Sequence, residues 1–103
     1  MIKVSNIRKV LGANVKYYRY QIGYTQEQLA EKCELSPRYI SDIENNKGNI
    51  SVDTLEIIAN NLKIESYLLI KPQKHPTLPK RVNMKWLFFL LYNFQLNFHR
   101  YSL

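Results

Sequence analysis

A chain of 103 residues accommodates one small domain and an additional segment, and 46% hydrophobic residues are enough to form a buried core. The formal charge is +7, and the bases gather at the two ends of the chain, where no acidic residue precedes Glu27 or follows Glu65. The single cysteine, Cys33, excludes a disulfide within the chain, and the longest apolar run, residues 86–92, is far shorter than the roughly 20 residues of a membrane-spanning helix. We therefore expect a cytoplasmic protein whose basic ends favour a polyanion, nucleic acid before an anionic membrane surface.

The first ten residues, 1–10, are predicted to be a basic lead-in, and the first helix is expected to follow them. Leu11, Val15 and Tyr18 recur at the spacing of one helical face. Gly23 can then supply the left-handed conformation with which many helices end. These residues predict a helix that starts near Leu11 and ends at Gly23.

Two short helices are predicted next, because two complete start signals occur between Thr25 and Glu44. Thr25 can cap the first of them, with Gln28 completing a capping box. Ser36 can cap the second, with Pro37 at its first helical position. The connection is so short that the two helices must cross sharply. Such a pair is a helix-turn-helix, in which the first helix supports the second in the major groove of DNA.

A fourth helix and a last short turn complete the expected domain. Ser51 can cap this helix, whose buried face is expected to consist of Leu55, Ile58, Ala59 and Leu62. The turn covers residues 65–70. The sequence therefore predicts an all-α fold, a compact bundle of five short helices over residues 11–70.

The character of the chain changes after residue 70. Prolines and bases make residues 71–83 a basic, semi-rigid linker. Residues 84–103 are rich in aromatic and aliphatic side chains, and we favour a helix there, although residues 94–98 also alternate as a strand would. We interpret this aromatic-rich extension as a dimerisation helix. The alternatives are a peripheral membrane anchor and a segment without a selected function.

The sequence lacks a residue pattern for catalysis or for metal binding. Asp42 and Glu44 lie two positions apart on a helix and so point in different directions. His75 and His99 fall in the linker and in the extension, with no cluster of ligands at metal spacing. We therefore expect no enzyme activity, no catalytic residue, no cofactor and no metal site.

Four stretches together carry a resemblance to a known family: LGANVKYYR, GYTQEQLAEK, LSPRYISDIEN and SVDTLEIIANNLKI. They resemble the Xre/Cro-type, or lambda-repressor-like, helix-turn-helix transcriptional regulators over about residues 11–70. Within that family, ISDIEN followed by ISVDTLEIIA looks most like small stand-alone regulators, including the controller proteins of restriction-modification systems. The resemblance implies a five-helix DNA-binding domain.

The resemblance also implies roles for single residues. A base-reading surface on the third helix would consist of Ser36, Pro37, Arg38, Tyr39 and Asp42. Contacts to the DNA backbone would come from Gln26, Lys47 and Asn49. A structural ion pair would join Arg19 to Glu44. The chain departs from the family at three places where glycine is common, namely Glu34, Asn46 and Lys63.

Arg38 is the foremost candidate for base reading, because a guanidinium can bind O6 and N7 of a guanine with two parallel hydrogen bonds. Its alternatives are a phosphate contact and a solvated surface side chain. For Pro37, a role as helix starter is favoured over a contact with a base. For Asp42, a role in orienting a neighbouring Arg or Lys is favoured over a contact with a base. Tyr39 suits a phosphate contact and partial core packing equally well.

Taken together, these features predict a sequence-specific regulator of transcription that binds double-stranded DNA as a homodimer. It would be a repressor or controller protein that reads an inverted repeat with its third helix in the major groove. The alternative is a protein-interaction module or antitoxin whose apolar extension binds a partner protein.

Overall fold

The computed structural model describes residues 4–75, and the predictions for the rest of the linker and for the extension 84–103 lie outside the described residues. Within this range there are five helices and no strand, which confirms the all-α prediction for the described part of the chain. The helices are α1 (Val4–Ile22), α2 (Gln26–Cys33), α3 (Pro37–Glu44), α4 (Val52–Leu62) and α5 (Tyr67–Ile70). None of the helices in residues 4–75 has the length and apolar character needed to cross a membrane.

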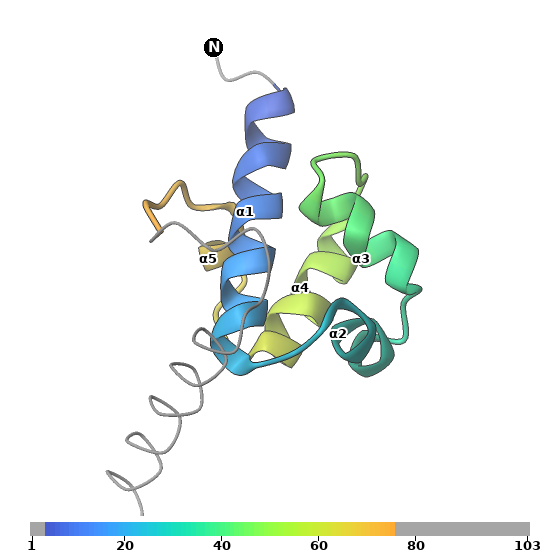
Figure 1. Ribbon diagram of the computed structural model, residues 1–103. Coiled ribbons are helices and arrows are strands. Elements are labelled where there is room, and N and C mark those ends of the chain that lie inside the picture. The colour runs from blue at the N-terminus through green and yellow to red at the C-terminus, as the bar shows by residue number, and fades with distance from the viewer. Residues whose placement is uncertain (1–3, 76–103) are drawn as a thin grey trace, which may run out of the picture.

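The other helices are arranged around α1, the longest element (Figure 1). It packs against α3 and α4 on one side and against α5 on the other, while α2 packs against both α3 and α4. Cys33 is buried among them, and burial raises the pKa of its thiol, as expected for a core residue. The largest fully buried side chains are apolar with one exception: Val15, Leu29, Ile40, Ile43, Ile58, Leu69 and the polar Asn14.

Helices α2, α3 and α4 begin where their cap residues predict. Thr25 Oγ1 accepts a hydrogen bond from Gln28 N at 3.0 Å, and Gln28 Oε1 accepts one from Thr25 N at 2.8 Å. Ser36 Oγ and Ser51 Oγ likewise accept from the amide three residues further on. Each cap satisfies an amide of the first turn that has no partner within the helix, so these boundaries are set by local sequence.

The predicted start of the first helix near Leu11 is wrong, because α1 begins at Val4 and most of the expected lead-in is helical. No proline stands before Leu11 to stop a helix there. Gly12, a poor helix former, serves a close contact. A Cβ at this position would lie 2.6 Å from the carbonyl oxygen of Ile43, so only glycine allows α1 to approach the end of α3 this closely.

Residues 71–75, predicted as the start of the linker, lie against α1. Asn14 on α1 is 1% exposed, and its Nδ2 donates to the carbonyl oxygens of Leu69 and Lys71 at 2.9 and 3.0 Å. Both amide hydrogens are therefore bonded to main chain, as a buried polar group requires. The predicted boundary at residue 70 thus cuts off a segment that is packed on the domain.

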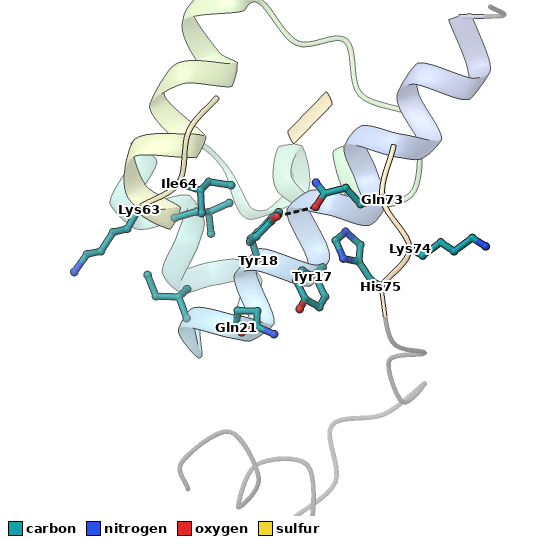
Figure 2. Close-up of a pocket in the computed structure, with 10 residues that line it drawn as sticks. Tyr17, Tyr18, Gln21, Lys63, Ile64, Gln73, Lys74 and His75 are labelled. Carbon is teal, nitrogen blue, oxygen red and sulfur yellow. Dashed lines mark hydrogen bonds between the residues drawn. The ribbon is translucent and has the colours of Figure 1, made fainter. Parts of the chain in front are cut away.

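An aromatic cluster continues this contact (Figure 2). His75 Nε2 donates to Asn14 Oδ1 at 2.6 Å, and the His75 ring stacks on Tyr17 with the two ring centroids 3.8 Å apart. Tyr18 donates its hydroxyl hydrogen to Gln73 Oε1 at 3.1 Å. Burial lowers the pKa of His75, which favours the neutral imidazole in this contact.

Three helix ends place a residue other than glycine in the left-handed region. Glu34 after α2, Asn46 after α3 and Lys63 after α4 have φ angles of 57°, 65° and 60°. Asparagine tolerates this conformation because its short side chain can form local hydrogen bonds. At Glu34 and Lys63, the close approach of Cβ to the following carbonyl oxygen costs about 1 to 2 kcal/mol.

We expect Lys63→Gly to stabilise the domain, because glycine adopts the left-handed region without a Cβ clash. The free energy of unfolding should rise by about 1 kcal/mol, and Tm by about 4 to 8 °C for a domain of this size. Urea and thermal unfolding measure both quantities. The control is Lys32→Gly at an exposed helical position of α2, where the same exchange should cost about 0.5 to 1 kcal/mol. A loss of stability in both variants would contradict the expectation.

Candidate nucleic-acid interface

Helices α2 and α3 form a helix-turn-helix whose link is only residues 34–36. Glu34 turns the chain with its left-handed φ, and Leu35 N donates to the carbonyl oxygen of Ala30 at 2.8 Å. Ala30 is completely buried beside this turn. On α3, Ile40 and Ile43 are anchored in the core, so the opposite side of the helix is left for solvent or a ligand.

A buried ion pair ties the end of α3 to α1. Arg19 Nε and Nη2 donate to the two carboxylate oxygens of Glu44 at 2.6 and 2.8 Å, and the two side chains are 7% and 3% exposed. Burial by itself lowers the pKa of Arg19, but the hydrogen bond and charge of Glu44, with smaller contributions from Tyr20, outweigh burial, so the net shift of this pKa is upward. The guanidinium therefore stays charged, and its planar fork fixes the orientation of Glu44.

The same pair also holds the beginning of α2. Arg19 Nη1 donates to the carbonyl oxygen of Tyr24 at 2.9 Å, and Gln26 Nε2 donates to Glu44 Oε1 at 3.2 Å. Gln26, a predicted backbone contact, is the first residue of α2 and is half-buried. Glu44 thus accepts hydrogen bonds from both Arg19 and Gln26. These bonds fix the start of α2 relative to the end of α3.

The exposed side of α3 carries most of the residues predicted to read bases. Ser36, Pro37 and Arg38 are exposed at its beginning, and Ser36 Oγ is engaged as the helix cap. The Arg38 side chain is 87% exposed, and its Nε lies 3.6 Å from Asp42 Oδ1 one turn further on. Because water screens an exposed pair of this kind, Asp42 biases the orientation of Arg38 without holding it tightly.

Tyr39 and Asn49 connect the start of α3 to the loop that follows this helix. Tyr39 is half-buried, and its hydroxyl donates to the carbonyl oxygen of Asn49 at 2.8 Å. Lys47 is exposed in this loop, and its amide donates to the carbonyl oxygen of Asp42 at 2.8 Å. Of the predicted backbone contacts, Gln26 is therefore bonded to Glu44, Asn49 to Tyr39 and Lys47 to the main chain of Asp42.

One residue of this region is missing from the sequence-based prediction. Arg8 on α1 donates from Nη2 to Asn49 Oδ1. In the sequence, Arg8 is one base in a basic segment, and a partner 41 positions away leaves no local signal. The spacing of Arg8 and Arg19, which places both on one face of a helix, is the only feature that could have indicated it.

The exposed groups gathered here are mainly hydrogen-bond donors. They include the guanidinium of Arg38, the ammonium of Lys47 and the side-chain amide of Asn49. Phosphate oxygens only accept hydrogen bonds, so this set suits a nucleic-acid backbone. Within residues 4–75 there is no group of three or more His, Cys, Asp or Glu side chains that could hold a metal ion.

Comparison with known proteins finds a family model, described as helix-turn-helix, that matches residues 15–69, just over half of the chain. The chain is similar to a hypothetical transcription factor of Neisseria meningitidis, with 36% identity over 70 residues that cover 67% of this chain and 66% of the relative. It is also similar to the immunity repressor protein of Bacillus phage phi105, with 44% identity over 55 residues, or 53% of this chain and 38% of the repressor. The chain thus spans less than two thirds of the length of these two relatives.

The similar solved structures include complexes with DNA. SinR, a master regulator for biofilm formation in complex with DNA, aligns with a TM-score of 0.57 and 34% identity over 59% of this chain and 98% of that chain. The restriction-modification controller protein C.Esp1396I, a tetramer in complex with its natural operator, aligns with a TM-score of 0.56 and 33% identity. That alignment covers 61% of this chain and 83% of the controller protein.

Arg19→Met should destabilise the domain by about 3 to 5 kcal/mol, because it leaves the buried carboxylate of Glu44 without its partner. Adding Glu44→Leu should recover most of this loss, since the double variant buries no charge. Urea unfolding followed by circular dichroism gives the free energies of the wild type and both variants. A loss below about 1 kcal/mol in Arg19→Met would show that the pair behaves as an exposed one and does not hold α3.

Proposed function

The chain belongs to the helix-turn-helix family, and from that premise we propose that it regulates transcription by binding double-stranded DNA at specific sequences. The observation that carries the proposal is the presentation of α3. Its apolar side is anchored in the core, its end is fixed by the pair of Arg19 and Glu44, and Arg38 stands 87% exposed at its beginning. A helix held in this way can enter the major groove with its first residues at the base edges.

Arg38 leads the base readout in this proposal. Its guanidinium can donate to O6 and N7 of one guanine, a contact worth about 1 to 3 kcal/mol of discrimination. Asp42 orients Arg38 through the exposed pair. Ser36 and Pro37 contribute mainly shape, because the Ser36 hydroxyl caps α3 and Pro37 has no donor and can only pack on a thymine methyl group.

Contacts to the DNA backbone come from Gln26, Lys47 and Asn49. Gln26 lies at the beginning of α2, where amides without helical partners also attract a phosphate. Lys47 is exposed and has no carboxylate partner among residues 4–75. The Tyr39 hydroxyl is bonded to the carbonyl oxygen of Asn49, which supports a role in positioning the loop.

A homodimer follows from the small number of base pairs that one helix can read. Two copies of α3 spaced about 34 Å apart would read an inverted repeat. The similar controller protein C.Esp1396I is a tetramer on its operator, and a similar phage protein is an immunity repressor, which supports assembly and repression here. Ile7 and Ile70 are about half exposed and line an apolar hollow between α1 and the end of α5, a surface that a second copy can cover.

Selection of binding sites from random duplex DNA tests this function, in about 150 mM salt to suppress binding to the backbone alone. We expect an inverted repeat with half-sites about one helical turn apart. Arg38→Ala should relax one position of each half-site and weaken binding by about 5- to 150-fold, the equivalent of about 1 to 3 kcal/mol. Lys63→Ala, a charge loss after α4, is the control and should change no position. If no sequence is enriched, the proposal fails and the alternative is a partner protein bound through residues 84–103.

A chain that ends at His75 tests what residues 76–103 contribute. These residues contain four bases and no acid, so their removal should flatten the slope of log affinity against log salt. Sedimentation equilibrium should show a shift from dimer to monomer. His75 is retained because it packs on Tyr17. A dimer that persists would contradict dimerisation through residues 76–103 and would leave the hollow lined by Ile7 and Ile70 as the candidate surface, and an unchanged slope would contradict a contribution of these bases to DNA binding.

A further inference from the structure

We propose that Arg8 and Asn49 together form a phosphate clamp that grips the DNA backbone beside the base-reading helix. The inference rests on the proposed DNA binding and adds a contact to it. Arg8 lies outside residues 15–69, the part of the chain that the family model matches. The ligand of the clamp is a single phosphodiester of the bound duplex.

The placement of Arg8 follows from one face of α1. Arg8, Gly12, Val15 and Arg19 recur at intervals of four, three and four, so they share a face of the helix. At one end of this face Arg19 binds the end of α3, and in the middle Gly12 permits the close approach of the two helices. At the other end Arg8 reaches Asn49. The contact surface that fixes α3 therefore also places the Arg8 guanidinium at the loop after α3.

The bond from Arg8 decides which way the Asn49 amide points. Its Oδ1 accepts from Arg8, so Nδ2 with its two hydrogens is turned away from the guanidinium. Asn49 is exposed, and nothing within residues 4–75 accepts a hydrogen bond from Nδ2. A phosphate oxygen can accept but not donate, so it fits the Nδ2 side of this amide.

Arg8 keeps most of its own donors for the same ligand. A guanidinium has five N–H donors, and the bond to Asn49 uses one of them. In the described part of the chain Arg8 has no carboxylate partner, whereas Arg19 and Arg38 pair with Glu44 and Asp42. Its charge is therefore not neutralised within the domain, and charge-assisted bonds to phosphate are the stronger kind.

The clamp is also held in register with the base-reading helix. Tyr39 directly follows Arg38 in α3. Its hydroxyl donates to the main-chain carbonyl oxygen of Asn49 at 2.8 Å and so fixes the position of Asn49. A phosphate bound at Asn49 would therefore stand at a set position relative to Arg38. A contact to the DNA backbone carries no sequence information itself. It sets the register of the protein on the duplex and so determines which base pair a neighbouring residue reads.

The salt dependence of operator affinity in the full-length protein tests the clamp, because each lost phosphate contact lowers the slope of log affinity against log salt by about 0.9. Arg8→Gln should lower the slope by this amount and weaken binding about fivefold at about 150 mM salt. Arg8→Lys retains the charge and should retain the slope. Lys63→Gln removes the same charge after α4 and should leave the slope unchanged.

A double variant separates the clamp from a general effect of charge. Because both residues would bind one phosphate, Asn49→Ala should cost less affinity in the Arg8→Gln background than in the wild type. Thermal unfolding of each variant shows whether affinity is lost through folding, a defect that leaves the salt slope unchanged.

Two results would overturn the clamp while the DNA-binding function stands. The first is a wild type that selects an operator and an Arg8→Gln variant with the full wild-type slope, which would make Arg8 a structural partner of the loop. The second is an equal change of slope in Lys63→Gln, which would show only long-range attraction. If the wild type shows no sequence preference at all, the proposed function fails, and the clamp fails with it.

Discussion

Two charges that are almost completely removed from water, on Arg19 and Glu44, determine how the candidate interface is held. Burying an ion pair costs much of the free energy that its attraction returns, so its main physical effect is orientation. The pair orients three segments at once, because Arg19 also binds the carbonyl oxygen of Tyr24 and Glu44 also accepts from Gln26. The middle of α1, the start of α2 and the end of α3 are consequently fixed to one another.

The side chains of α3 that face solvent are held less tightly than the buried pair of Arg19 and Glu44. Among the described residues Arg38 forms an ion pair with Asp42 alone, and that pair is exposed to water. Replacing the pair with Asp42 by a contact between Arg38 and a charged or polar group of DNA therefore requires little free energy. The fold combines a precisely positioned helix with side chains on it that are free to adjust, which is what direct contact with base edges demands.

The extent to which the sequence predicts this structure depends on how far apart the interacting residues lie. Thr25, Ser36 and Ser51 set helix starts through bonds that span three residues, so these boundaries could be predicted. The burial of Asn14 and the contact of Arg8 with Asn49 join residues 41 to 57 positions apart, and no local pattern indicates them. The pairing of Arg19 with Glu44 was implied only by the family resemblance.

The role of Gly12 also depends on a residue that is distant in the sequence. In the sequence it is only a residue that weakens a helix, and the predicted helix rested on the spacing of Leu11, Val15 and Tyr18 instead. In the structure its missing side chain is what allows the carbonyl oxygen of Ile43 to come close, so the glycine is explained by a neighbouring helix and not by its own. The start of α1 at Val4 has a separate reason, because no proline before Leu11 stops the helix.

The aromatic cluster around His75 has a consequence for how the domain can be used. At about 100° per residue, Tyr17 lies half a turn from the face of α1 that carries Arg8 and Arg19. His75 stacks on Tyr17, so the end of the described chain lies on the side of α1 away from α3, where Figure 1 shows it in orange. A reporter or an effector enzyme fused at this point would begin behind the helix-turn-helix and leave the exposed side of α3 open. Residue 75 is therefore an attachment point that does not compete with the candidate interface.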